Sequence, residues 1–178
     1  MADKKRLKQQ VVAAVDKYSD ELLALCSHLI QIPSVNPPGD STEITTFIKD
    51  YLEHNGLSVD IHESKENMYN LISSYGNTEG KNLIYCGHTD VVPVGNLAKW
   101  DFDPFSGEII DGYLLGRGAS DMKAGLGGLI FSVVLMKKLG IELDGQVTLA
   151  IVPDEETGGR YGVPWILEND LIKGDGCL

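Results

Sequence analysis

The spacing of apolar residues along the chain alternates between a helical and an extended period. Between residues 7 and 30, apolar side chains recur every three or four positions, which predicts one long amphipathic helix or two abutting helices. The proline-rich segment 32–39 ends this pattern, because proline lacks an amide donor and restricts the residue before it. A second helical pattern follows; Asp40 or Ser41 is suited to cap its start, and Gly56 to end it.

Extended patterns separate the helical ones. Leu57, Val59 and Ile61 alternate with polar residues, which predicts a strand with one exposed face. Uninterrupted apolar runs instead predict strands buried on both faces. Such runs predict strands at 83–86, in a central position, and at 146–152, and a further strand is expected at 69–74. Helices are expected after residue 125 as far as Gly140 and at 163–168, and a hairpin around Asp111 and Gly112. The alternation predicts an α/β fold with a mixed, largely parallel sheet that is flanked by helices on both faces.

Length, charge and cysteine content narrow the class of protein. The 178 residues suffice for one domain, and the net charge of -11 argues against a nucleic-acid partner. No apolar stretch approaches the roughly 20 residues of a spanning helix, and no signal-peptide core follows the N-terminus, so a soluble protein without a membrane partner is expected. The three cysteines are widely separated and form no C-x-x-C pair, which favours a reducing, cytoplasmic location.

Acidic residues and a histidine gather where predicted strands end. His88 and Asp90 follow the strand at 83–86, and Glu155 and Glu156 follow the strand at 146–152. Asp121 lies in a glycine-rich segment that enters a helix. Because ligands collect at the carboxyl ends of strands in open α/β sheets, these residues are expected to converge. Like charges that gather after a buried strand would repel one another, and a divalent cation would offset that repulsion.

Simpler interpretations fit each cluster alone. A histidine two residues before an aspartate also occurs in ordinary turns, and Asp121 also suits a helix N-terminus. Residues 154–156 also fit a solvated acidic turn. The segment 116–121 has the first two glycines of a dinucleotide fingerprint, but Asp121 replaces the third and would oppose a pyrophosphate. No phosphate-binding loop of the G-x-x-x-x-G-K-[ST] type and no nucleophile elbow is present in the sequence.

Three motifs together resemble one known family. In order along the chain they are residues 87–93 (GHTDVVP), 116–125 (GRGASDMKAG) and 154–159 (DEETGG). They are similar to the motifs of the zinc-dependent family of acetylornithine deacetylase, succinyl-diaminopimelate desuccinylase, aminoacylase and carboxypeptidase G. Segments 33–37 (PSVNP) and 100–105 (WDFDPF) are similar as well, so that the resemblance covers most of the chain from about Leu29 onward.

The resemblance implies a site with two zinc ions, with cobalt as an alternative metal. It assigns His88 to one ion and Glu156 to the other, with Asp121 bridging both. Asp90 would orient the imidazole of His88, and Glu155 would act as the general base toward the attacking water.

The family also implies a function and a larger architecture. In its members the peptide bond after the bridging aspartate is cis, so Asp121–Met122 is expected to be cis. The expected activity is hydrolysis of the amide bond in N-acyl amino acids, as in amino-acid biosynthesis; a dipeptidase or carboxypeptidase is the alternative. An interaction or regulatory module that has lost its metal is the alternative of another class. Members are about twice as long and contain a lid or dimerisation domain, so residues 1–178 are expected to form the N-terminal part of one catalytic domain of a homodimer.

Overall fold

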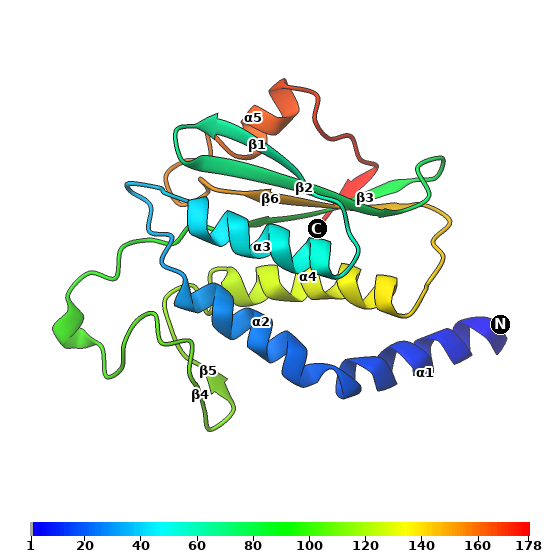
Figure 1. Cartoon of the computed structure of the whole chain (residues 1–178), viewed down its shortest axis with the longest axis horizontal. Helices are drawn as coiled ribbons and strands as arrows, with labels where there is room; N and C mark the ends of the chain where they lie inside the picture. Colours follow the sequence, from blue (N-terminus) through cyan, green and yellow to red (C-terminus); the bar gives the residue numbers. More distant parts are fainter. Residues whose placement is uncertain (1) are drawn as a thin grey trace.

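A five-stranded mixed sheet forms the centre of the molecule, in the strand order β1-β2-β6-β3-β7 (Figure 1). The computed structural model describes residues 2–178, with side chains from residue 4 onward. The strands of this sheet are β1 (Asp60–Lys65), β2 (Met68–Gly76), β3 (Asn82–His88), β6 (Gln146–Val152) and β7 (Gly176–Cys177). The helices are α1 (Ala2–Lys17), α2 (Ser19–Gln31), α3 (Thr42–His54), α4 (Lys123–Lys138) and α5 (Val163–Glu168), with a 3-10 helix at Leu97–Lys99.

The strand directions agree with the predicted mixed, largely parallel sheet. β2 is antiparallel to β1 and to β6, while β3 is parallel to β6 and to β7. Four strands therefore run in one direction and only β2 runs in the other. β3 is paired on both sides, as expected for an interior strand, but it is not buried on both faces, because Leu83 is 40% exposed. The middle strand is β6, which is buried from Val147 to Val152.

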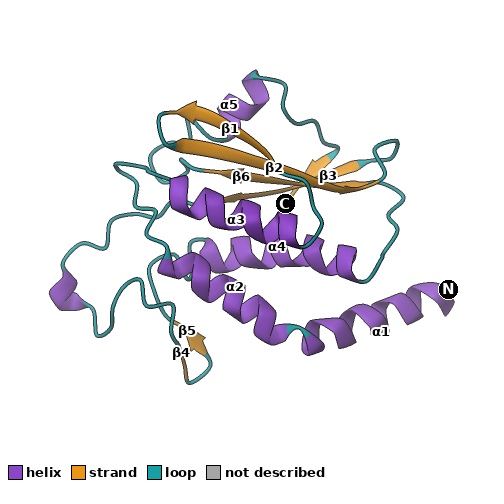
Figure 2. Cartoon of the chain, in the orientation of Figure 1, coloured by secondary structure: helices purple, strands orange, loops and turns teal. Residues whose placement is uncertain are grey.

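Helices cover both faces of the sheet, as predicted (Figure 2). On one face, α2, α3 and α4 bury the larger core, in which Leu29, Ile48, Ile130 and Leu149 are fully buried. On the other face, Ile166 of α5 packs against a smaller cluster that includes β3 and β6 side chains. None of the helices among residues 2–178 is long and apolar enough to cross a membrane.

Local structure confirms several predicted boundaries. The long helical pattern forms two abutting helices, of which α1 ends at Lys17 and α2 begins at Ser19. Ser41 is the N-cap residue of α3 but makes no side-chain cap hydrogen bond; Oδ1 of the preceding Asp40 accepts from Thr42 N at 2.9 Å. The predicted hairpin forms between β4 (Ile109–Ile110) and β5 (Tyr113–Leu114), with positive φ at both turn residues, Asp111 and Gly112.

One predicted strand begins later than expected. The alternation from Leu57 to Ile61 predicts a strand over the whole stretch, but β1 starts at Asp60. Leu57 is buried in the core from the connection after α3, whereas Ile61 remains 37% exposed. The apolar residues here therefore do not share one strand face.

Candidate metal centre

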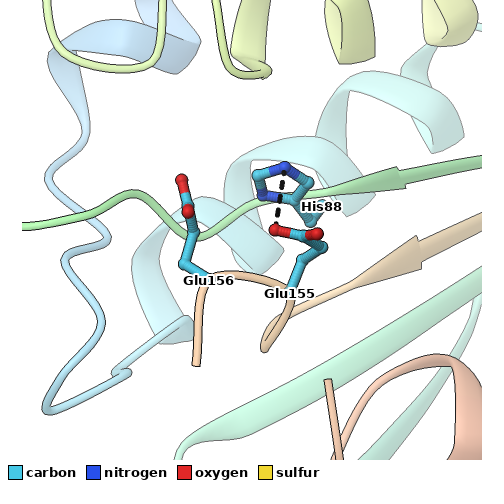
Figure 3. Close-up of side chains that lie close together, drawn as sticks. All are labelled: His88, Glu155 and Glu156. Atoms are coloured by element: carbon cyan, nitrogen blue, oxygen red, sulfur yellow. Dashed lines mark ion pairs between the residues drawn. The ribbon is translucent and has the colours of Figure 1, made fainter. Parts of the chain in front are cut away.

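The carboxyl ends of β3 and β6 bring two of the predicted clusters together. The two strands are parallel, and His88 at the end of β3 lies beside Val152 at the end of β6. Thr89 N donates to Val152 O at 2.9 Å, so that the segments after both strands start side by side. Figure 3 shows the side chains of Glu155 and Glu156 reaching from the segment after β6 toward His88.

The side chains of three predicted residues are close enough to share a metal ion. A nitrogen of His88 and carboxylate oxygens of Glu155 and Glu156 all lie within 4.8 Å of one another. His88 Nε2 is 3.8 Å from a Glu155 oxygen and 3.1 Å from Asp121 Oδ1. Asp121 lies in the loop before α4. Bond lengths of about 2.0–2.2 Å place neighbouring ligand atoms of tetrahedral zinc roughly 3.3 Å apart. The donor atoms are of types that bind zinc, and the His88–Asp121 separation of 3.1 Å is close to this spacing.

His88 is fixed in one orientation. Its side chain is 5% exposed, and Nδ1 is 3.0 Å from the backbone oxygen of Asp90 and 3.3 Å from Asp90 Oδ1. A carbonyl oxygen only accepts hydrogen bonds, so we assign a proton to Nδ1, which leaves Nε2 facing the exposed carboxylates. Burial opposes the charged imidazole, but the hydrogen bonds and charge of Asp90, with a further contribution from Asp121, raise the pKa of His88 to about 9.

The outer carboxylates are open to solvent. The side chain of Asp121 is 74% exposed and that of Glu155 is 60% exposed. The pKa of Glu156 is raised by partial burial and then by the nearby charge of Asp121. The Asp121–Met122 peptide bond is cis, which confirms the expectation from the resemblance.

Asp90 differs from these three acids because its oxygens are already engaged. It is 2% exposed and accepts hydrogen bonds from the backbone amides of Glu155 at 3.0 Å and Glu156 at 3.1 Å. Burial raises the pKa of Asp90, but hydrogen bonds from His88, Asn36 and the two amides outweigh it and lower the pKa. The contacts are those of a carboxylate that holds other residues in place.

The sequence did not predict the burial of three further polar residues at this edge. Asp154, expected to lie with the acidic cluster, is 2% exposed and turned inward. Asn36 is 3% exposed and joins Asp90 to Asp154. Lys123, at the start of α4, is fully buried and donates from Nζ to Ile32 O at 2.5 Å. Burial lowers the pKa of Lys123 to about 7, although the charge of Asp90 opposes this shift. The available signal was that each is a polar residue within a segment that resembles the family, 33–37, 116–125 or 154–159.

The fold and the cluster of donor atoms describe an α/β domain with a candidate metal centre at the carboxyl edge of its sheet. Residues 84–177, just over half of the chain, match peptidase family M20/M25/M40. The chain belongs to this family, in agreement with the resemblance found in its motifs.

Individual relatives are similar over most of the chain. A succinyl-diaminopimelate desuccinylase of Ehrlichia ruminantium (strain Gardel) is 37% identical over 164 residues, which cover 88% of this chain and 42% of the relative. An N-formyl-4-amino-5-aminomethyl-2-methylpyrimidine deformylase of Bacillus subtilis (strain 168) is 35% identical over 148 residues, which cover 81% of this chain and 35% of the deformylase. The chain thus spans less than half the length of these relatives.

A solved structure confirms the fold class. The M20 family metallo-carboxypeptidase Sso-CP2 from Sulfolobus solfataricus superposes with a TM-score of 0.75 at 26% sequence identity. The match covers 89% of this chain and 36% of the carboxypeptidase. The arrangement of sheet and helices is therefore that of a catalytic domain of this family.

Proposed function

We propose that this chain contributes to a metal-dependent hydrolase that cleaves the amide bond of N-acyl amino acids. The observation that carries the proposal is the convergence of His88, Glu155 and Glu156, with ligand atoms within 4.8 Å of one another, at the carboxyl edge of the sheet. Family membership supports it, as do the names of two relatives, a desuccinylase and a deformylase, which both describe removal of an acyl group.

His88, Asp121 and Glu156 would hold the metal, with Asp121 shared between two zinc ions. The chemistry of the donors supports this assignment, because one imidazole nitrogen and several carboxylate oxygens suit zinc, and also cobalt. When bound, zinc polarises a carbonyl group and lowers the pKa of water. Asp90 holds His88 by its Nδ1 side, so that Nε2 points toward the carboxylates.

Glu155 is the proposed general base. Its side chain is 60% exposed to solvent, and one carboxylate oxygen lies 3.8 Å from His88 Nε2. It accepts a proton from the attacking water and then delivers that proton to the leaving amine. The backbone amides of Glu155 and Glu156 both donate to the Asp90 carboxylate, which holds the two consecutive glutamates near His88.

A dipeptidase or carboxypeptidase is the second candidate. It is favoured by the similarity to the metallo-carboxypeptidase from Sulfolobus solfataricus, which is 26% identical. Rates on N-succinyl amino acids, N-acetyl amino acids and dipeptides distinguish the two functions. The lid domain and the homodimer expected for the whole protein stay predictions.

Zinc binding tests the proposal directly. Wild-type chain is expected to bind zinc in stoichiometric amount, as measured by elemental analysis after dialysis. Asp121→Ala removes the shared ligand and should weaken binding at least tenfold. Asp144→Ala, an exposed acid before β6 at the opposite edge of the sheet, is the matched control and should bind as wild type does. Absence of zinc from the wild-type chain, or equal binding by Asp121→Ala, would contradict the proposed centre.

A further inference from the structure

Two buried carboxylates lie directly behind the candidate metal centre. Asp90 and Asp154 follow the neighbouring strands β3 and β6, and each is only 2% exposed. Two carboxylates this close in a dry environment repel each other unless donors lie between them. The group that lies between them is the side-chain amide of Asn36.

Asn36 bridges the two carboxylates with one amide group. Its Nδ2 is 2.9 Å from Asp90 Oδ2, 3.0 Å from Asp154 Oδ1 and 3.1 Å from Thr157 Oγ1. An amide oxygen in this place would face two acceptors, so the nitrogen must point inward. The two N–H groups of the amide match the two carboxylates that need donors.

Each bridged carboxylate also holds the backbone of the loop that carries the two glutamates. Asp90 accepts from the amides of Glu155 and Glu156. Asp154 accepts from Tyr161 N at 3.1 Å and from the hydroxyl of Thr157. The loop after β6 is therefore attached at both ends to the pair of carboxylates that Asn36 joins.

The backbone of Asn36 is itself fixed to the sheet edge. Asn36 N donates to Val91 O at 2.9 Å, and Val91 N donates to Ser34 O at 3.0 Å. Val35 and Val91 form an isolated parallel bridge, which extends the line of β3. Asn36 is thus a rigid donor that reaches the loop from a segment 118 residues away in the sequence.

We propose that Asn36 is a positioning residue that sets the loop of Glu155 and Glu156 relative to His88 by bridging Asp90 and Asp154. Its side-chain amide contacts Asp90, Asp154 and Thr157, and it acts through the two carboxylates. Its effect on zinc binding rests on the proposed function, whereas its effect on the loop does not. A single buried amide thereby joins the segment of Asn36 to the segments after β3 and β6.

Amide hydrogen exchange of the metal-free chain tests the positioning. The measured quantity is the exchange ratio, the exchange rate of the Glu155 and Glu156 amides divided by that of Leu149 in the middle of β6. In Asn36→Asp, which has nearly the same shape but adds a third carboxylate, this ratio should rise at least tenfold. Ser34→Ala is the matched control, because it removes another buried hydrogen bond of the same segment, 2.6 Å to Thr89 O. That control should leave the exchange ratio unchanged. An unchanged ratio in Asn36→Asp would overturn the proposal.

Zinc titration separates this inference from the proposed function. Wild-type chain should bind zinc, Asn36→Asp should bind it at least tenfold more weakly, and Ser34→Ala should bind it normally. If the wild-type chain binds no zinc, the proposed function fails while hydrogen exchange still decides the role of Asn36. Faster exchange with unchanged zinc affinity would refute the link between the bridge and the metal centre. Asn36→Ala, which removes the donors without adding charge, replaces Asn36→Asp should the latter not fold, and the same outcomes apply.

Discussion

Two sets of carboxylates lie at the same edge of the sheet and differ in almost every physical respect. Asp90 and Asp154 are each 2% exposed, and backbone or side-chain donors satisfy their oxygens. The side chains of Asp121 and Glu155 are 74% and 60% exposed. Burial with full hydrogen bonding makes the inner pair structural, whereas the outer pair keeps oxygens free to face a cation or a proton.

The difference shows how neighbouring acids acquire separate tasks. Asp154 and Glu155 are adjacent in the sequence, yet one side chain turns inward and the other outward. A buried carboxylate without partners would be costly, so the inner position requires donors that only the fold can supply. The outer position requires none, because water solvates it when no ligand is present.

The largest expected effect concerns chemistry at the outer set. Glu155→Ala should reduce turnover by about 10²–10⁴-fold, the usual contribution of a general base, while zinc content stays at the wild-type value. Glu79→Ala, an exposed glutamate in the loop after β2, is the control and should leave both quantities unchanged. Near wild-type hydrolysis of acetylornithine-like substrates by Glu155→Ala would show that the base is assigned wrongly.

Stability should separate the inner set from the outer set. Asp90→Ala removes the acceptor of the partly buried amides of Glu155 and Glu156, and one of the acceptors of the Asn36 side chain. The free energy of unfolding in EDTA should fall by about 3 kcal/mol. Asp121→Ala, at an exposed site, should change it by no more than about 0.5 kcal/mol. Urea unfolding measures both, and equal losses would remove the distinction between the two sets.

His88 contacts Asp90 of the inner set and Asp121 of the outer set, and zinc binding is expected to release a proton from it. Its pKa of about 9, above the ordinary 6.5, means that metal must displace a proton at neutral pH. Zinc binding at pH 7 should release about one proton from His88, and affinity should rise about tenfold from pH 7 to pH 8. Binding in weak buffer with a pH indicator measures the release, and His88→Gln should abolish that contribution.

The stability of the metal-free chain depends on pH with the opposite sign to zinc affinity. Because the folded-state pKa of His88 is raised, its stabilising contribution is fully present below pH 6.5 and is lost as the pH rises through about 9. Urea unfolding of the metal-free chain at pH 6 and pH 9, compared with His88→Gln, measures this contribution. A wild-type chain with the same pH dependence as His88→Gln would contradict the proton placed on the imidazole.

Periodicity in the sequence was sufficient to locate most elements. Residues 146–152 and 163–168 coincide with β6 and α5, and the turn at Asp111 and Gly112 is formed as predicted. These features follow from local physics, because hydrophobic spacing, turn residues and helix-ending glycines act within a few positions. The motifs also placed His88, Asp121, Glu155 and Glu156 at element ends, where the structure brings their side chains together.

Only the tertiary structure decided how these residues are divided and held. The sequence does not show that β6 is the middle strand, or that Asp154 turns inward while the next two acids do not. It also does not show that Asn36 reaches across 118 positions to join Asp90 and Asp154. Such outcomes depend on strand register and on the donors available inside the folded chain, and these arise from contacts between distant segments that no local pattern encodes.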